Sequence, residues 1–298
     1  MFLLTSLAGL LKDPPPAYAF EVSEAGIAVA ELARPPRMSF AQLEPEVISV
    51  SPLRDNVLRP EAVLNQVRAA AQGDGSRKRR RAALILPDYA VRVTVLDFDS
   101  FPSDGREQAS LVRFRMKRTV PFDVDAAALS FHAQPDRANG KRVDVAAAVA
   151  PLEIVVRYET PFRLAGFHPG WVTTSTLAAL ELVPQTGLNV LAKRTGRILS
   201  LAVLDHGALK LVRSIAMTDF SAEEILGHLF PTFAYVEDQL SRSPDLLLVC
   251  GFGTAAEGAR DWLASELGVR TEPLTSRLGQ PGEFNAGLLG YLEALKEA

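Results

Sequence analysis

Three turns in this chain carry residue types that bind anions or metals in other proteins. The first lies in "FEVSEAG", where Ser23, Glu24 and Gly26 interrupt apolar residues that alternate on both sides. Alternation around a short polar break predicts two strands joined by a tight turn. Such a turn is either plain architecture or a loop that holds phosphate through its backbone N–H groups. Glu24, a negative charge at the tip, disfavours phosphate.

The second turn is basic. "AKRTGR" places Lys193, Arg194 and Arg197 around Gly196, and positions 182–204 contain no acidic residue. We interpret it as a solvated basic loop, with contact to an anion or nucleotide as the alternative. Without a carboxylate it cannot ligate magnesium.

The third turn, "VCGFGTAAEGA", contains Gly251 and Gly253 after an apolar segment. Its next glycine, Gly258, follows after four residues instead of the two of a dinucleotide-binding fingerprint. Packing explains a Gly-x-Gly at such a turn as well as a ligand does.

Other chemistry finds little support. The four histidines lack metal-ligand spacing, and no Gly-x-Ser-x-Gly or Ser-x-x-Lys motif occurs. Asp97 and Asp99 share one face of a predicted strand, most simply the solvent face. The run "SRKRRR" at 76–81 is interpreted as a solvated loop, with anionic lipid or an acidic partner as the alternative.

Composition limits the class of protein. The 298 residues are 48% hydrophobic and 22% charged with a net charge of −3, which indicates a globular chain without a nucleic-acid footprint. One cysteine excludes an internal disulfide and favours a reducing compartment. The apolar start "MFLLTSLAGLL" is too short to span a bilayer, so residues 1–16 are expected to form a tail, with membrane or partner contact as the alternative.

The strands and helices around these turns determine whether the turns lie close together in the fold. Each half of the chain contains a strand hairpin, a helix, a strand and a helix, with an extra αβ segment in the first half, and two such halves meet at a cleft. The expected strands are 19–22, 27–32, one near 47–50, 82–87, 91–98, 128–134, 143–150, a hairpin over 197–217, and 245–251. The expected helices are 60–72, 106–118, one that carries 154–162, 176–182, 221–242 and 257–267.

Several segments, in order, resemble the actin-like ATPase superfamily and, within it, the PilM-like assembly proteins of type IV pili. They are "FEVSEAGIAVAEL", "ALILPDYAVRVTVLDFDSFP", "LVRFRMKRTVPFDVDAAALSFHAQ" and "LDHGALKLVRSI". The cytoplasmic part of the type II secretion protein GspL is a looser match. The resemblance implies an α/β, two-lobed actin-like (ribonuclease H-like) ATPase fold, with lobes at 17–185 and 186–298 and a small inserted αβ subdomain near 45–135.

In this superfamily two hairpins clamp the phosphates of a nucleotide and a third loop touches the adenosine. Here Glu21 replaces an aspartate, Ser23 a glycine and Ala28 a lysine of the first hairpin, and the second hairpin has lost its acid. The resemblance therefore implies a degenerate cleft that requires no cofactor, with ATP or ADP and magnesium as a structural ligand the alternative. Its candidate residues are Glu21, Ser23, Gly26, Lys193, Gly196, Gly251 and Gly253.

PilM-like proteins capture the cytoplasmic N-terminus of the membrane protein PilN in a groove between subdomains. The resemblance thus implies a non-hydrolysing scaffold at the inner face of the inner membrane, in type IV pilus or type II secretion machinery, with other platform proteins as further partners. Its candidate groove residues are Arg92, Phe98, Arg113 and Lys117. The alternatives are an active ATPase or sugar-kinase-like enzyme, and a secretion protein that has lost its membrane anchor.

Overall fold

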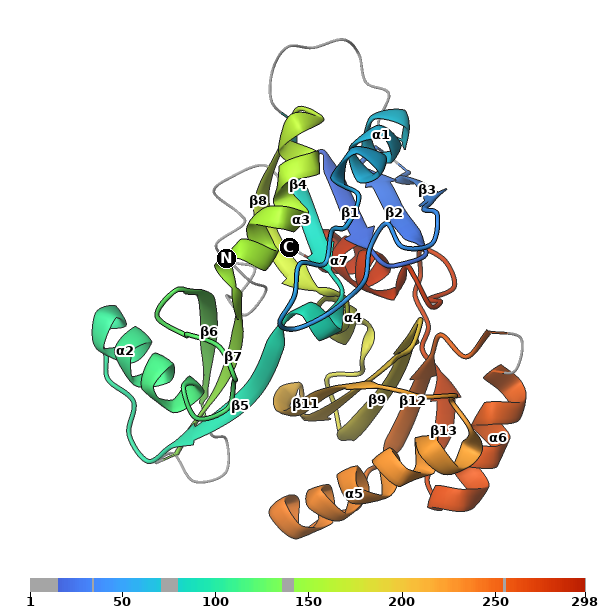
Figure 1. The fold of residues 1–298 in the computed structure, drawn as a ribbon. Coiled ribbons are helices and arrows are strands. Elements are labelled where there is room, and N and C mark those ends of the chain that lie inside the picture. The colour runs from blue at the N-terminus through green and yellow to red at the C-terminus, as the bar shows by residue number, and fades with distance from the viewer. Residues whose placement is uncertain (1–15, 34, 71–79, 136–141, 254–255, 298) are drawn as a thin grey trace.

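The strands in the part of the chain that the structure describes form three sheets. The computed structural model describes residues 16–33, 35–70, 80–135, 142–253 and 256–297. Two five-stranded sheets form separate lobes, and a three-stranded sheet lies beside them (Figure 1).

The first-lobe sheet has the order β3-β2-β1-β4-β8. Strands β1 and β2 are the antiparallel hairpin expected from the sequence, and β4 and β8 continue the sheet in parallel. All five residues of β1 are buried, so both faces of the sheet are covered. The strands are β1 (Tyr18–Val22), β2 (Gly26–Glu31), β3 (Arg37–Gln42), β4 (Arg80–Leu86) and β8 (Phe167–Thr174).

Helices cover this sheet on two sides. On one side Phe20 packs against Phe162 of α3 (Leu152–Leu164), with ring centroids 5.0 Å apart, and α1 (Pro60–Ala70) joins the same core. On the other side Ala19 faces the C-terminal helix α7 (Ala286–Glu297), which packs on α4 (Ser175–Ala179). A Cβ at Gly290 would overlap the carbonyl of Ala178, so glycine permits this close approach.

The second-lobe sheet has the order β11-β10-β9-β12-β13. Its outer face packs on α5 (Ala222–Leu240), and its inner face turns toward the first lobe, where Leu191 and Ala202 join the first-lobe core. Figure 1 shows α7 and α4 between the two large sheets. The remaining elements are β9 (Leu188–Thr195), β10 (Ile198–Asp205), β11 (Ala208–Ala216), β12 (Leu246–Cys250), β13 (Thr271–Pro273) and α6 (Ala256–Leu267).

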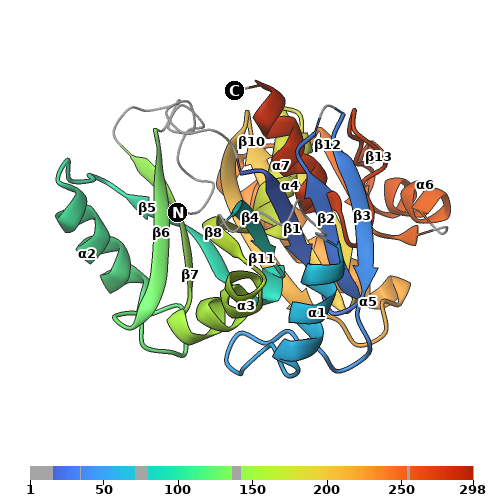
Figure 2. The ribbon, with the colours of Figure 1, turned by 90° about the horizontal axis from the view of Figure 1, so that it is seen from above.

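The inserted subdomain comprises a three-stranded antiparallel sheet of order β5-β7-β6 and one helix (Figure 2). Its central strand is the nearly continuous apolar segment "VDVAAAVA". One face of the sheet forms a core of its own with the helix, whereas Val93, Ala146 and Ala148 on the other face join the first-lobe core. The elements are β5 (Arg92–Phe98), α2 (Gly105–Met116), β6 (Ala127–Pro135) and β7 (Val143–Pro151).

These bounds differ from the insertion expected near 45–135. The inserted strands begin at Arg92 and end at Pro151 because β7 pairs with β5 and β6 rather than with the first-lobe sheet. Conversely, α1 and β4 belong to the first lobe, since β4 pairs with β1. Helix α7 also packs on the first lobe, although the expected boundary of 186–298 places it in the second.

Candidate functional site

Asp88 lies at the boundary between the lobes, just after β4 ends. Pro87 stops the strand, and Asp88 opens a short 3₁₀ turn, Asp88–Ala90. Its carboxylate accepts hydrogen bonds from the backbone N–H of Thr176, at 2.6 Å, and from the Thr176 hydroxyl, at 2.7 Å. Both bonds stay within the first lobe and fix the carboxylate against the start of α4.

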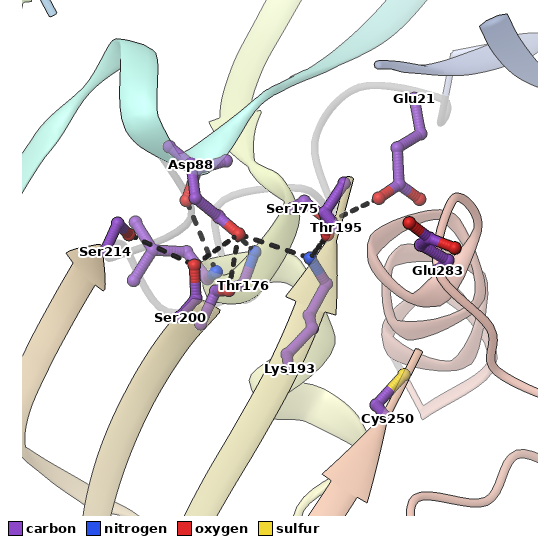
Figure 3. A network of polar contacts seen from close by, with 12 residues as sticks. Glu21, Asp88, Ser175, Thr176, Lys193, Thr195, Ser200, Ser214, Cys250 and Glu283 are labelled. Atoms are coloured by element: carbon purple, nitrogen blue, oxygen red, sulfur yellow. Dashed lines mark hydrogen bonds and ion pairs between the residues drawn. The ribbon is translucent and has the colours of Figure 1, made fainter. Parts of the chain in front are cut away.

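The second lobe supplies two more donors to the same carboxylate (Figure 3). Lys193 and Ser200 lie directly opposite each other on β9 and β10, so their side chains leave the sheet on the same face. The Lys193 ammonium is 3.2 Å from Oδ2 of Asp88, and the Ser200 hydroxyl donates to that oxygen at 3.0 Å. Lys193 also donates to the Thr195 hydroxyl at 2.6 Å. An ion pair and a hydrogen bond therefore join the two lobes.

The ion pair is fully buried, with Lys193 0% exposed. Burial alone raises the pKa of Asp88, but the charge of Lys193 and the bonds from Thr176 and Ser200 hold it below its ordinary value. Burial alone lowers the pKa of Lys193, but the charges of Asp88 and Glu21 raise it above its ordinary value. Both groups are thus ionised at neutral pH.

Glu21 is a second buried carboxyl near this pair. It accepts hydrogen bonds from the Ser175 hydroxyl and, at 2.7 Å, from the backbone N–H of Leu288. Burial raises its pKa by more than the Lys193 charge and the two hydrogen bonds lower it. Glu21 therefore anchors α4 and α7 to β1, all within the first lobe.

In the first two candidate turns, the polar groups make hydrogen bonds to other groups of the chain. In the first, the Ser23 hydroxyl donates to the Gly26 carbonyl at 2.9 Å and accepts from the Gly26 N–H at 3.2 Å. Glu24 accepts the backbone N–H of Val50 at 2.8 Å. In the second, the Gly196 N–H donates to the carboxylate of Glu283 at 2.8 Å. The Ser23 hydroxyl and the N–H groups of Gly26 and Gly196 are thus bonded within the chain itself.

A cavity of about 120 Å³ lies between these turns. Pockets for small ligands typically measure ~300 Å³ or more. Four donors already bond to the Asp88 carboxylate, one at Oδ1 and three at Oδ2. A cavity of this volume is too small for a magnesium nucleotide. The cavity is lined by Ser23, Glu24, Ala25, Val50, Pro87, Asp88, Thr195, Gly196, Ile198 and Phe284.

The third turn has a packing explanation. Gly251 has a φ of +81°, and a Cβ there would overlap the carbonyl of Arg194. Gly253 also has a positive φ, of +63°, with open space around it. Burial raises the pKa of the neighbouring Cys250 to about 12, so its thiol is neutral.

A larger cavity, the junction pocket, lies where the two lobes meet the inserted subdomain. It measures about 280 Å³, and apolar side chains form most of its wall. Strands β5 and β11, on two of its sides, are each the edge strand of a sheet. Arg92 supplies a cation to the wall. The pocket is lined by Pro52, Tyr89, Val91, Arg92, Val93, Thr119, Val120, Pro121, Phe122, Val212 and Ser214.

Known structures superpose on nearly the whole chain. A chain of a "PilM-PilN type IV pilus biogenesis complex" superposes with a TM-score of 0.76 at 18% identity, covering 95% of this chain and 99% of that one. The chain has the actin-like ATPase fold. The fold predicted from the sequence is thereby confirmed, including its likeness to PilM.

Two further structures have the same fold. The cytoplasmic domain of EpsL, an inner membrane component of the type II secretion system of Vibrio cholerae, aligns with a TM-score of 0.54 at 12% identity over 94% of both chains. A Bacteroides thetaiotaomicron protein with an actin-like ATPase fold and unknown function aligns with a TM-score of 0.55 at 11% identity, covering 97% of this chain and 98% of that one. No family model and no curated protein matches the sequence.

Only some of the candidate cleft residues line the cavity between the lobes. Ser23 and Gly196 line the small cavity, whereas Gly26 lies where a Cβ would meet the Phe40 ring and β3. Lys193 does not lie in a solvated loop, as the sequence interpretation had it, but on a buried strand. Glu21 lies on β1 beneath α7.

Sequence reasoning missed Asp88, Thr176 and Ser200. Asp88 carried one signal, a carboxylate directly after a buried strand that ends in proline. Thr176 and Ser200 carried none, because threonine and serine are common at helix starts and on strands.

The candidate groove residues do not lie together in one pocket. Arg92 lines the junction pocket, whereas Phe98 lies in the core of the inserted subdomain beside Phe101. Arg113 donates to the Val124 carbonyl at 2.8 Å, and Lys117 pairs with Asp125 at 2.6 Å. These three residues are outside the lining of the junction pocket.

Proposed function

We propose that this protein is a scaffold of an inner-membrane assembly platform of the type IV pilus or type II secretion kind. It binds an extended segment of a PilN-like membrane protein in the junction pocket and does not hydrolyse ATP. The observation that carries the proposal is this pocket, an open apolar cavity between two edge strands, beside a cleft whose charged groups are already paired.

The wall of the pocket indicates the chemistry of the segment. Edge strands expose backbone N–H and C=O groups that an extended peptide can pair with, and alternate side chains of such a peptide enter neighbouring pockets. Val120, Phe122 and Val212 favour apolar side chains. Arg92 favours a carboxylate beside them. The preferred occupant is an extended, mainly apolar segment with one acidic residue.

The structural neighbours support the setting of this proposal. One of them was solved in a complex named for PilM and PilN, and another is the cytoplasmic domain of an inner-membrane secretion component. No helix among the described residues is long and apolar enough to cross a membrane. In this proposal the protein acts at the cytoplasmic face of the inner membrane, held there by its partner.

An active ATPase or sugar-kinase-like enzyme on the same fold remains the alternative function. Such an enzyme needs an acid on each phosphate hairpin to hold magnesium and the attacking water. The second hairpin carries Lys193 in that region, and this lysine pairs with Asp88. Magnesium-dependent ATP hydrolysis well above background would favour the enzyme.

Calorimetry with a synthetic peptide tests the scaffold. The peptide covers the cytoplasmic N-terminal segment of a PilN-like membrane protein. We expect it to bind the wild type, and Val120→Asp to weaken binding at least about tenfold because it places a carboxylate in the apolar wall. Phe114→Asp is the matched control, since Phe114 is 64% exposed on α2 and outside the pocket. Equal affinity of all three proteins would contradict the proposed pocket.

A further inference from the structure

A chain of side chains connects the cleft to the junction pocket. Ser214, which lines the pocket, lies 3.1 Å from the hydroxyl of Ser200. Ser200 has one hydroxyl proton and donates it to Asp88, so Ser214 must donate to Ser200. The path from the pocket wall to the buried ion pair therefore has a defined direction, Ser214 to Ser200 to Asp88.

The first lobe contributes to the same pocket at the same point. Tyr89 follows Asp88 directly and also lines the pocket. Movement of Asp88 relative to β10 would thus shift both a first-lobe wall, Tyr89, and a second-lobe wall, Ser214. The Lys193–Asp88 pair opposes that movement because separating it would leave two buried charges unpaired.

Lys193 is fully buried among side chains of both lobes. The titratable groups near it are Asp88, Glu21 and Cys250, from the 3₁₀ turn, β1 and β12. Cys250 is neutral at physiological pH, since burial raises the pKa of its thiol to about 12. The Lys193 ammonium is therefore the cation whose charge stabilises the ionised forms of both buried carboxyl groups, Asp88 and Glu21. Bound cations play this role in other carboxylate clefts.

We propose that Lys193 is the built-in cation of this cleft: it holds the lobes closed and, through Asp88, Ser200 and Ser214, keeps the junction pocket formed without any nucleotide. This inference rests on the proposed function, because it concerns the regulation of the same pocket. Lys193 acts on the pocket as a positioning residue and does not touch the partner. The scaffold is then permanently ready to bind, whereas a nucleotide-dependent relative would need its ligand first.

Hydrogen exchange of the free protein tests this inference without any partner peptide. We expect exchange in β5 and β11 of the wild type to stay unchanged when magnesium and ATP are added. Ser200→Ala breaks the path but keeps the ion pair, and we expect it to speed exchange about two- to tenfold around Val212 and Ser214, as the loss of one hydrogen bond predicts. Lys193→Met should speed exchange there and at Thr176.

Lys117→Met is the matched control, since Lys117 pairs with Asp125 within the inserted subdomain, at 2.6 Å, and is not part of the path. A purely structural role of the network would speed exchange evenly over the second lobe, including β12 and β13, and that result would overturn the inference. Unchanged exchange in Ser200→Ala, or a change caused by ATP in the wild type, would overturn it as well. If Lys193→Met does not fold, Ser200→Ala decides the question. Failure of the peptide to bind would contradict the proposed function and leave the exchange pattern untouched.

Discussion

The interlobe cleft and the junction pocket lie side by side, joined through Asp88 and Ser214, yet they are built in opposite ways. The cleft is small, about 120 Å³, and its carboxylate, ammonium and hydroxyl groups bond to one another. The pocket is about 280 Å³, mostly apolar, and bounded by two edge strands. The cleft thus satisfies its own charges across the two lobes, whereas the pocket presents an apolar wall beside two edge strands.

We expect the largest loss of stability from Lys193→Met. Removing one partner of a buried ion pair leaves an uncompensated charge, which typically costs about 3–5 kcal/mol of unfolding free energy. Denaturation by urea measures this loss. Lys210→Met, which removes a pair whose side chains are 20% and 21% exposed, should cost about 1 kcal/mol or less. Equal losses in the two variants would mean that the Lys193–Asp88 pair does not hold the lobes together.

Replacing both Asp88 and Lys193 tests whether the two side chains act as a pair. In Asp88→Asn with Lys193→Met no charge is left unpaired, so the double variant should be more stable than the sum of the single losses predicts. Additive losses would show that the two side chains do not act as a pair.

Glu21→Gln should change how stability depends on pH. The pKa of Glu21 is raised above its ordinary value of 4.5 in the folded protein, so the folded state holds this proton more tightly than the unfolded state. Its contribution to unfolding free energy therefore falls as pH rises from 4.5 through the folded pKa. The variant should lack this fall.

Paired urea titrations of the wild type and Glu21→Gln from pH 4.5 to 8 measure the difference. Asp88, whose pKa lies below 3.8, keeps its charge over that range and does not contribute. Parallel pH profiles would show that Glu21 has no raised pKa.

Arg92→Ala tests the pocket with a smaller effect. Arg92 is exposed and lines the pocket, so its removal should weaken peptide binding by about 1 kcal/mol or less and reduce the salt dependence of affinity. Arg113→Ala is the control, because Arg113 bonds the Val124 carbonyl within the inserted subdomain. A salt dependence that is the same in both variants would place the cation of the binding site elsewhere.

Glu24→Ala should have the smallest effect. The exposed Glu24 accepts one bond, from the N–H of Val50, and its loss should lower unfolding free energy by about 0.5–1.5 kcal/mol. We expect no gain of nucleotide binding, because Asp88 and Lys193 still fill the cleft. Calorimetry with magnesium and ATP checks this, and measurable binding by the variant would show that Glu24 alone had closed the site.

Local patterns predicted much of the fold but not the ion pair. The alternation around Ser23 predicted the β1–β2 hairpin, and the apolar run 143–150 predicted the central strand of the insertion. A strand near 47–50 was wrong, since this stretch forms only an isolated bridge between Ile48 and Val57. The true edge strand β3 was missed because its side chains are largely exposed and its apolar alternation is weak.

Lys193 shows why the candidate site was harder to predict. Beside Arg194 and Arg197 it resembles a solvated charge run, although it is in phase with Leu191 on the inner face of β9. Its partner Asp88 is 105 residues away in the chain. Such pairing depends on how the lobes close, which no local pattern encodes.

The most direct test of the account is one peptide titration carried out twice, without nucleotide and with saturating magnesium and ATP. The scaffold with a self-filled cleft predicts the same affinity in both titrations and no heat from magnesium and ATP alone. Peptide binding that appears only after magnesium and ATP are added would contradict it.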